Sequence, residues 1–456
     1  MCKNFENRLI SCLKTKIEKV YGMKKILYIV LDGLGDGRYP CKELGNLTPL
    51  EAADTPTMDM LAREGQTGLM YTVGKGIAPE SDIAVISILG YDAVKYYTGR
   101  GPLEALAVGL KIKDGDLAFR ANFATRGTGR QIKDRRVGRN LSTEDATQLC
   151  EEINKKVKLD SIPATFTFKN TLEYRGVLVV RGVKNKLSGY VTNTDPAYTK
   201  HGLLGVAKET GTFENIVEYC MPVHDCPDID AAYRSALLVN EFTLKSCEVL
   251  DQSEVNKKRI KKGDLPANLV LLRDAGDHLP KLPTIKNKFK KNFGCFVEMP
   301  TEEGIAMLTG MRIVPIPPPT KDLEKDYTLR ANMTIKNMKK YDGLYIHIKG
   351  PDVPGHDGDA IRKKTIIEAI DRYYLTPLID SIDLDKTIVA ITADHSTPCR
   401  LKSHSDDPVP LLISGGNINP DTTKSFSEKA CLAGKIGKIN GTQLMPLLVK
   451  YANANK

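Results

Sequence analysis

Residues 23–33 read MKKILYIVLDG, an apolar run of strand length that ends in an aspartate and a glycine. Two later stretches have the same shape: residues 341–352 read YDGLYIHIKGPD, and residues 385–395 read DKTIVAITADH. Runs that are apolar on both faces are typical of strands in parallel sheets buried between helices. Helical patterns in residues 48–65 and 359–380 lie between these runs. The sequence therefore predicts an α/β core with a mainly parallel sheet.

Each of these three runs ends in a carboxylate, namely Asp32, Asp352 and Asp394. In open α/β sheets, ligands bind beyond the carboxyl ends of the strands. A single aspartate after a strand is usually a turn former. Three aspartates that reach the same edge of a sheet, two of them accompanied by histidine, indicate a functional site.

The middle of the chain has a different pattern. From about residue 110 to 297 the expected strands are shorter and more polar, and the Pro-rich VPIPPPT (314–320) marks the return toward the first architecture. We therefore expect a core formed by residues 23–109 and 298–456, with an α+β domain, residues 110–297, inserted into it. Residues 1–22 form an N-terminal extension, a candidate for disorder or for a mis-called start, whose deletion we expect to leave activity intact.

Composition narrows the class of partner. The chain has 456 residues, a formal charge of +10, no tryptophan and 6% aromatic residues, so stacking platforms for bases are poorly supplied and a small anionic substrate is favoured over nucleic acid. No apolar stretch reaches the roughly 18–20 residues that a membrane span needs, and no membrane partner is expected. The ten scattered cysteines form no CxxC pair, which predicts reduced thiols and a cytoplasmic location. A homo-oligomer is left open.

Histidines and carboxylates in the last third of the chain indicate a metal site. Asp352 and His356 are four residues apart, and the prolines and glycine around them (Pro351, Pro354 and Gly355) favour a loop over a helix. Carboxylates and imidazoles together suit Mn²⁺, Mg²⁺, Co²⁺ or Zn²⁺. There are enough candidate ligands for two ions: Asp32, Asp352, Asp394, His356, His395 and His404. The other histidines (His201, His224, His278 and the strand residue His347) are assigned to the surface or the core.

A candidate nucleophile stands at a predicted helix start. Residues 76–92 read GIAPESDIAVISILGYD, and Ser81 immediately precedes a helical apolar pattern. A hydroxyl there feels the positive end of the helix dipole, and a neighbouring divalent ion would activate it further. The alternative is structural, because serine is among the commonest N-cap residues.

These motifs together resemble a known family. LDGLGD, PESDIA with LGYD, YTGRGPLEA, KGPDVPGHDG and TADHSTP, with His404 before DPVP, are similar to the archaeal-type, cofactor-independent phosphoglycerate mutases of the alkaline phosphatase superfamily. The resemblance runs in order from about Met23 to the C-terminus. It implies an alkaline-phosphatase-like core that binds two divalent ions, and interconversion of 3-phosphoglycerate and 2-phosphoglycerate without 2,3-bisphosphoglycerate.

The resemblance also implies residue roles. Asp32, Ser81, Asp394 and His395 would hold one ion, Asp352, His356 and His404 would hold the other, and Ser81 would be transiently phosphorylated. A phosphorylated glycerate needs fixed cations, and arginine forks suit carboxylate and phosphate. The substrate-binding candidates are Arg100, Arg135, Arg139, Arg273 and Lys349.

Three alternatives remain at this stage. The nearest is another metal-dependent enzyme of the superfamily, either a phosphohydrolase or another phosphomutase. A nucleic-acid-binding protein would use the arginine-rich residues 119–139, and its binding would fall steeply with salt. A catalytically inactive metal-binding scaffold would keep its ions but ignore substitution of Ser81.

Overall fold

The computed structural model describes residues 24–201, 203–208 and 212–454. The chain forms two compact units: the first contains the residues up to Ala93, Pro283–Glu298 and the residues from Thr309 onward, and the second contains Val94–Leu282 and Met299–Leu308. Compared with the expected domain bounds, residues 94–109 and 299–308 lie in the second unit and residues 283–297 lie in the first. The extension 1–22 lies outside the described residues.

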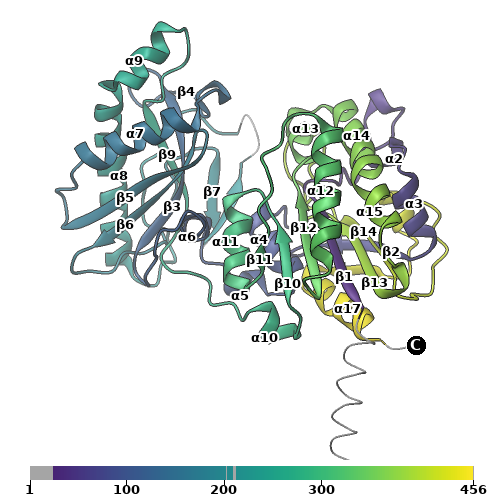
Figure 1. Ribbon diagram of the computed structural model, residues 1–456. Helices are drawn as coiled ribbons and strands as arrows, with labels where there is room; N and C mark the ends of the chain where they lie inside the picture. The colour runs from purple at the N-terminus through teal and green to yellow at the C-terminus, as the bar shows by residue number, and fades with distance from the viewer. Residues whose placement is uncertain (1–23, 202, 209–211, 455–456) are drawn as a thin grey trace, which may run out of the picture. The chain divides into compact units, whose positions relative to one another are not determined.

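The first unit is built on an eight-stranded sheet (Figure 1). Its order is β11 (Arg312–Ile313), β10 (Phe293–Phe296), β12 (Gly343–Ile348), β1 (Lys25–Leu31), β13 (Thr387–Thr392), β14 (Val409–Gly415), β2 (Gln66–Tyr71) and β15 (Gly437–Asn440). The three strands that the sequence predicts are direct neighbours, with β1 parallel to both β12 and β13. Only β14 in this sheet runs antiparallel to its neighbours. The expected α/β core with a mainly parallel sheet is confirmed.

Helices cover this sheet. They are α2 (Pro49–Ala52), α3 (Pro56–Arg63), α4 (Ser81–Ile88), α12 (Leu323–Met338), α13 (Asp352–Asp357), α14 (Ala360–Ala369), α15 (Thr376–Asp380) and α17 (Gly441–Asn453). The helical pattern predicted for residues 48–65 forms α2 and α3, because the extended Ala53 ends α2 and Pro56 starts α3. The pattern in 359–380 forms α14 and α15 joined by a π-helical turn, η3 (Ile370–Leu375). Pro377 follows that turn and has no N–H to continue the regular bonding.

A buried tyrosine links the central strand to α4. The Tyr28 hydroxyl donates to the Ile88 carbonyl at 3.0 Å, and its ring packs edge-on against Tyr345 of β12 at 5.4 Å. Every residue of α4 is buried, which is why its sequence is apolar around the whole circumference. This packing fixes the helix that begins with Ser81.

The second unit is α+β. Its five-stranded antiparallel sheet consists of β4 (Ile132–Asp134), β3 (Leu117–Arg126), β6 (Arg175–Gly182), β5 (Ala164–Leu172) and β9 (Leu269–Gly276), and a separate hairpin consists of β7 (Tyr198–His201) and β8 (Leu204–Ala207). The helices include α6 (Arg100–Ala107), α7 (Thr143–Lys156), α8 (Ile229–Asp251), α9 (Glu254–Lys261) and α11 (Pro300–Thr309). Ser142 caps the N-terminus of α7, because its hydroxyl accepts from the Asp145 N–H.

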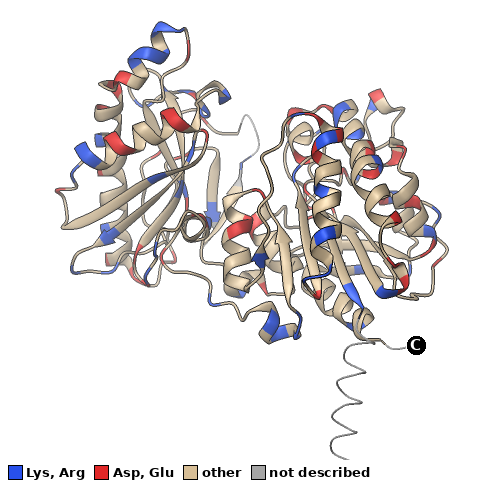
Figure 2. Cartoon of the chain, in the orientation of Figure 1, with Lys and Arg blue, Asp and Glu red and all other residues tan. Residues whose placement is uncertain are grey.

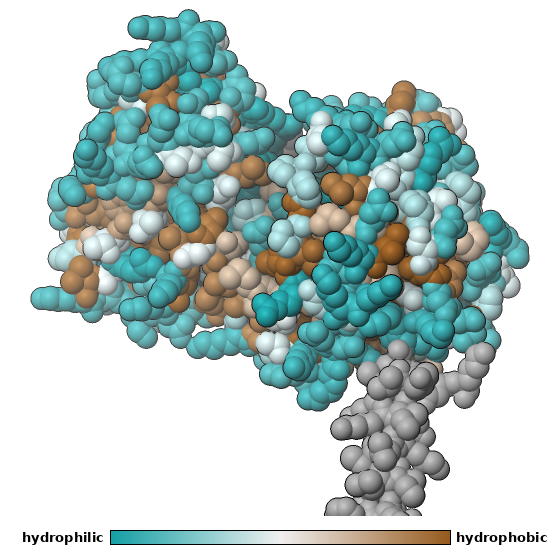
Figure 3. Space-filling model, viewed as in Figure 1, coloured by the Kyte–Doolittle hydropathy of each residue, from teal (hydrophilic) through white to brown (hydrophobic). Residues whose placement is uncertain are grey.

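Charge and hydropathy follow these layers. Lys, Arg, Asp and Glu lie mostly on helices and loops, while the strands are largely uncharged (Figure 2). The face shown in Figure 3 is mostly hydrophilic, with apolar side chains gathered in patches. Among the described residues, none of the helices combines the length and the apolar character needed to span a bilayer.

Candidate metal and phosphoryl-transfer site

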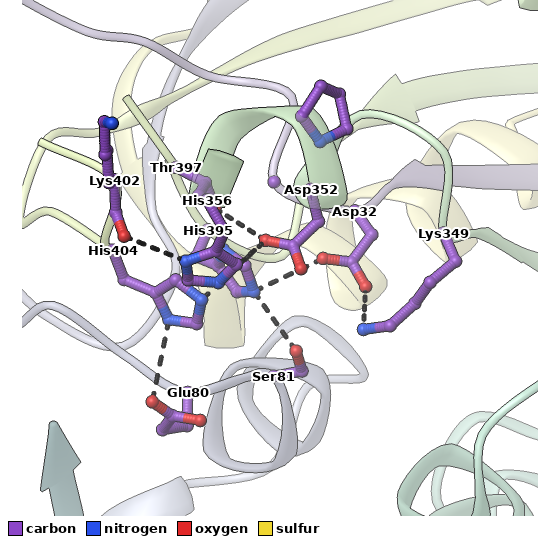
Figure 4. Close-up of polar contacts among 12 residues, drawn as sticks. Asp32, Glu80, Ser81, Lys349, Asp352, His356, His395, Thr397, Lys402 and His404 are labelled. Carbon is purple, nitrogen blue, oxygen red and sulfur yellow. Dashed lines mark hydrogen bonds and ion pairs between the residues drawn. The ribbon is translucent and has the colours of Figure 1, made fainter. Parts of the chain in front are cut away.

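The candidate site lies beyond the carboxyl ends of β12, β1 and β13 in the first unit. Asp32 directly follows β1, Lys349 directly follows β12, and Asp394 and His395 come just after β13. Because the three strands are parallel neighbours, their ends meet at one edge of the sheet. Figure 4 shows Asp32, Asp352 and His395 converging there, with Ser81 approaching from α4.

A first group of candidate ligands contains Asp32, Asp394 and His395, all buried. The Nε2 atom of His395 lies 3.4 Å from Asp32 Oδ1 and 3.3 Å from Asp394 Oδ2. The Ser81 hydroxyl lies 3.1 Å from the same Nε2 atom. Folding therefore gathers four side chains that the sequence separates by up to 363 positions, and all four point at one small volume.

A second group surrounds Asp352. Its Oδ1 atom lies 3.5 Å from His356 Nε2 and 3.8 Å from His404 Nε2. The rings of His395 and His404 stack at 3.7 Å, so the two groups adjoin. The tightest cluster of possible ligand atoms around Asp352 contains His395 and His404, and the half-exposed His356 stands just outside it.

The loop predicted for residues 349–358 is wrong. Asp352–Asp357 form the short helix α13, which directs Asp352 and His356 to one face. Pro351 and Pro354 do not prevent this, because they lie at the N-cap and in the first turn, where a backbone N–H has no partner within the helix. Gly358 ends the helix in the left-handed conformation.

Two of the imidazoles are held by main-chain carbonyls. His404 Nδ1 lies 2.8 Å from the Pro79 carbonyl, and His356 Nδ1 lies 3.1 Å from the Lys402 carbonyl. A carbonyl can only accept, so each Nδ1 is the donor, and in the neutral ring each Nε2 turns its lone pair toward Asp352. This is the arrangement that metal-ligating histidines usually show.

The charges of the first group are strongly perturbed. Burial would raise the pKa of Asp32, but the Lys349 ammonium paired with it and the neighbouring imidazoles hold that pKa well below its usual range. Burial, and then the charge of Asp32, raise the pKa of Asp394 to about 7. Burial also lowers the pKa of His395. Two carboxylates in one dry site cannot both ionise at low cost unless a cation is shared between them.

The residues fit such a cation. Asp32 Oδ1 and Asp394 Oδ2 are buried and accept no hydrogen bond from any residue that the structure describes. Buried polar atoms are normally satisfied, so orphaned oxygens beside neutral imidazole nitrogens indicate atoms reserved for a ligand. The donor set of carboxylate oxygen and imidazole nitrogen suits divalent ions of the Mn²⁺, Mg²⁺, Co²⁺ and Zn²⁺ type.

Comparison with known proteins identifies the family of this chain. Residues 62–256 match the family model described as 2,3-bisphosphoglycerate-independent phosphoglycerate mutase. A protein of that name from Aeropyrum pernix is 40% identical over 91% of this chain and 96% of its own length, and one from Thermococcus kodakarensis is 39% identical over 95% and 98%. The chain belongs to the 2,3-bisphosphoglycerate-independent phosphoglycerate mutase family.

Solved structures of the same fold support this membership. A protein from Pyrococcus horikoshii matches with a TM-score of 0.74 at 31% identity, over 95% of this chain and 99% of that one. The cofactor-independent phosphoglycerate mutase from Thermoplasma acidophilum matches with a TM-score of 0.60 at 31% identity, over 94% and 100%. The fold class expected from the sequence is thereby confirmed for this member of the mutase family.

Within the second unit, an arginine cluster contains several of the predicted substrate residues. Arg100 Nε and Arg120 Nη1 donate to the same Glu104 oxygen at 2.8 and 2.7 Å. Arg273 of β9 lies directly opposite Arg120 of β3 in the strand ladder, a placement of like charges that normally destabilises a sheet. Burial would raise the pKa of Glu104, but Arg120 and Arg100 outweigh it and lower that pKa to about 2.

The remaining predicted arginines differ from each other. Arg135 donates twice to Asp195, at 3.0 and 2.7 Å, and its guanidinium and that of Arg273 lie 5.5 and 3.8 Å from the centre of the Tyr198 ring. Arg139 is exposed at the end of a 3₁₀ turn, η2 (Val137–Arg139), with a φ of 55°. Arg120, which was not among the predicted substrate-binding residues, is thus more central to the cluster than Arg139.

Sequence reasoning missed His347. This buried residue of β12 places Nε2 3.4 Å from Asp32 Oδ2 and 3.6 Å from Asp394 Oδ2, and its Nδ1 lies 3.2 Å from the Tyr345 hydroxyl. The available signal was its spacing, because His347 and Lys349 are two residues apart at the end of a strand and share one face. A histidine inside an apolar strand was assigned to the core by default.

Replacing Asp394 tests the electrostatics of the first group. An asparagine can still accept at Oδ1 from the N–H groups of Gly33 and His395, but it carries no charge. In the native state Asp394 has a pKa of about 7, above its unfolded value of about 3.9, so the metal-free parent loses stability as pH rises between these values. Metal-free Asp394→Asn should therefore unfold a few degrees above the parent at pH 8, with the gap closing toward pH 5.

The same variant should lose the rise in unfolding temperature that Mn²⁺ gives the parent, because a ligand stabilises only the state that binds it. Calorimetry or circular dichroism with and without Mn²⁺ measures both effects. A variant with the parent's Mn²⁺ response would show that Asp394 is not a ligand.

Proposed function

We propose that this chain interconverts 3-phosphoglycerate and 2-phosphoglycerate through a phosphoserine formed on Ser81, at a centre that holds two divalent ions. The observation that carries the proposal is the position of the Ser81 hydroxyl, 3.1 Å from His395 Nε2 and beside the orphaned oxygens of Asp32 and Asp394. A serine that only capped a helix would have no reason to face this group. The N-cap of α4 is in fact Glu80, and Ser81 is the first helical residue.

The ligand sets follow from the two groups of side chains. Asp32, Ser81, Asp394 and His395 would hold one ion, and Asp352, His356 and His404 would hold the other. Divalent ions at these positions supply positive charge that activates the hydroxyl and neutralises the phosphoryl oxygens. Mn²⁺ is the preferred candidate, and Mg²⁺, Co²⁺ and Zn²⁺ are the alternatives. No 2,3-bisphosphoglycerate is needed, because Ser81 itself carries the phosphoryl group between the two hydroxyls.

The chain's own residues perform the transfer. Ser81 Oγ forms a bond to phosphorus while the bond from phosphorus to the glycerate oxygen breaks, and the reverse step delivers the group to the other hydroxyl. The N-terminus of α4 favours the negative charge that develops at Oγ. Lys349, paired with Asp32 at the edge of the site, is placed to contact the phosphoryl oxygens. During the reorientation the glycerate has to stay bound and water has to stay out, or the phosphoenzyme is hydrolysed.

The arginine cluster of the second unit is the candidate for holding the anionic substrate. Arg100, Arg120 and Glu104 together carry one net positive charge, and Arg273 lies opposite Arg120 in the ladder. Arg273 also pairs with Asp274, and a bound carboxylate or phosphate would accept further hydrogen bonds from these guanidinium groups. Arg135, held by Asp195, would extend the same cluster. Arg139 stays a candidate with less support, because it is exposed.

The alternatives make different predictions. A phosphohydrolase with the same site would release free phosphate from 3-phosphoglycerate instead of forming 2-phosphoglycerate.

Nucleic-acid binding is favoured by a stripe of basic residues, whereas Figure 2 shows basic residues interspersed with acidic ones on the helices. The family membership favours the mutase. A cytoplasmic location and a homo-oligomer stay predictions.

Replacing Ser81 tests the covalent route. With 3-phosphoglycerate and Mn²⁺, Ser81→Ala should lose at least about 10³-fold in kcat, because the variant lacks the hydroxyl that accepts the phosphoryl group. Ser87→Ala is the matched control, since Ser87 is a second buried serine of the same helix. The assay follows 2-phosphoglycerate and free phosphate separately. Normal isomerisation by Ser81→Ala would refute the phosphoserine, and phosphate as the main product of the parent would favour the hydrolase.

Replacing Arg273 tests the anion site. Arg273→Lys keeps the positive charge but removes the planar fork, so KM for 3-phosphoglycerate should rise about 10-fold or more. Arg126→Lys is the control, because Arg126 ends β3 and pairs with Asp251. Equal KM values for the two variants would remove Arg273 from the substrate site.

A further inference from the structure

We propose that Thr397 is a positioning residue that fixes the tautomer of His395 and links the two metal-ligand groups through its hydroxyl. This inference rests on the proposed function, since it concerns how the ligand set is held. Thr397 is fully buried and lies two residues after His395, in the loop that follows β13. Figure 4 shows it between His395 and Asp352.

The hydrogen bonds of this hydroxyl determine its role. Thr397 Oγ1 lies 2.8 Å from Asp352 Oδ1 and 3.1 Å from His395 Nδ1. An ionised carboxylate can only accept, so the single hydroxyl proton goes to Asp352. The hydroxyl then has only lone pairs left for His395, and Nδ1 is the donor. His395 Nε2 is therefore unprotonated and faces Ser81, Asp32 and Asp394.

Thr397 thereby accepts a hydrogen bond from Nδ1–H of His395, as main-chain carbonyls do from His356 and His404. The difference is that a carbonyl only accepts, whereas the Thr397 hydroxyl also donates. The chain of bonds from His395 Nδ1–H through Thr397 to Asp352 joins a ligand of the first group to a ligand of the second. A change in the position of Asp352 is thus transmitted directly to the His395 ring.

The surroundings hold Thr397 in place. Its N–H donates to the Gly35 carbonyl at 2.9 Å, and its carbonyl accepts from the buried Lys363 ammonium at 3.0 Å. A Cβ on Gly33 would lie 2.7 Å from the Thr397 hydroxyl, and one on Gly355 would lie 2.5 Å from its carbonyl oxygen. The glycines of the LDG and PGH motifs therefore both leave room for this one threonine.

Substitution of Thr397 by valine distinguishes the effect of the hydroxyl from the effect of the side chain's shape. Thr397→Val keeps the branched side chain but leaves the His395 N–H without an acceptor and Asp352 Oδ1 without a donor. Thr397→Ser restores the hydroxyl. Thr392→Val is the matched control, because Thr392 is also fully buried, lies in β13, and donates only to the Pro410 carbonyl at 2.9 Å.

The test measures the tautomer first, in the metal-free full chain. With ¹⁵N-labelled histidine, and the His395 signals assigned by their loss in His395→Gln, the parent and Thr397→Ser should show a protonated Nδ1 and an unprotonated Nε2. Thr397→Val should lose that fixed pattern, and Thr392→Val should keep it. A protonated Nε2 in the neutral ring of the parent would overturn the proposal without any variant, even if Thr397→Val fails to fold.

Mn²⁺ titration by calorimetry provides the second readout. Loss of a supporting partner of a metal ligand typically weakens affinity 10–100-fold, and Thr397→Val should fall in that range while Thr397→Ser stays close to the parent. Parent-like Mn²⁺ binding by Thr397→Val would overturn the inference while leaving the proposed function intact. Absence of Mn²⁺ binding by the parent would instead refute the proposed function.

Discussion

The structure depends on the proximity of two buried carboxylates at neighbouring strand ends. Asp32 and Asp394 follow β1 and β13, and parallel pairing of these strands brings both carboxylates within 3.4 Å of His395 Nε2. Without a shared cation, their repulsion and their loss of hydration oppose folding. The Lys349 ammonium on Asp32 and the raised pKa of Asp394 are the responses of the protein alone. The same unfavourable charge suits this group of side chains to a divalent ion.

The surrounding helices and loops place the other side chains of the site around Asp32 and Asp394. α4 is buried on every side and points its first residue, Ser81, at the carboxylates. α13 and the loop after β13 bring Asp352, His356 and His404 next to this group. Main-chain carbonyls orient the His356 and His404 rings, and the Thr397 hydroxyl orients the His395 ring. The proposed phosphoryl transfer would need this preorganisation, because the proposed metal ligands and the proposed nucleophile have to be in place before the phosphoryl group arrives.

Much of this site can be predicted from the sequence. The apolar runs that end in Asp32, Asp352 and Asp394 indicate parallel strands, and parallel strands bring their carboxyl ends to one edge. The motifs also identify Ser81 and three of the four histidines of the site. His347 was missed because a histidine within an apolar strand has no local feature that separates a core role from a site role. Thr397 was missed for a similar reason, since only the tertiary contact with Asp352 reveals its function.

Other features depend on tertiary structure that local patterns do not contain. Prolines and a glycine argued against a helix at residues 352–357, yet the short helix α13 forms there. Its prolines lie at the N-cap and in the first turn, where no helical hydrogen bond is lost. The position of Arg120 opposite Arg273 depends on the register of β3 with β9. The exposure of Arg139 depends on the turn η2, in which it is the last residue.

The most direct measurement is anomalous X-ray diffraction from crystals grown with Mn²⁺. The account predicts two manganese peaks in each chain: one among Asp32, Ser81, Asp394 and His395, and one among Asp352, His356 and His404. The absence of both peaks from these groups, or their appearance only elsewhere on the molecule, would contradict the claim that these carboxylates are held together in order to bind metal.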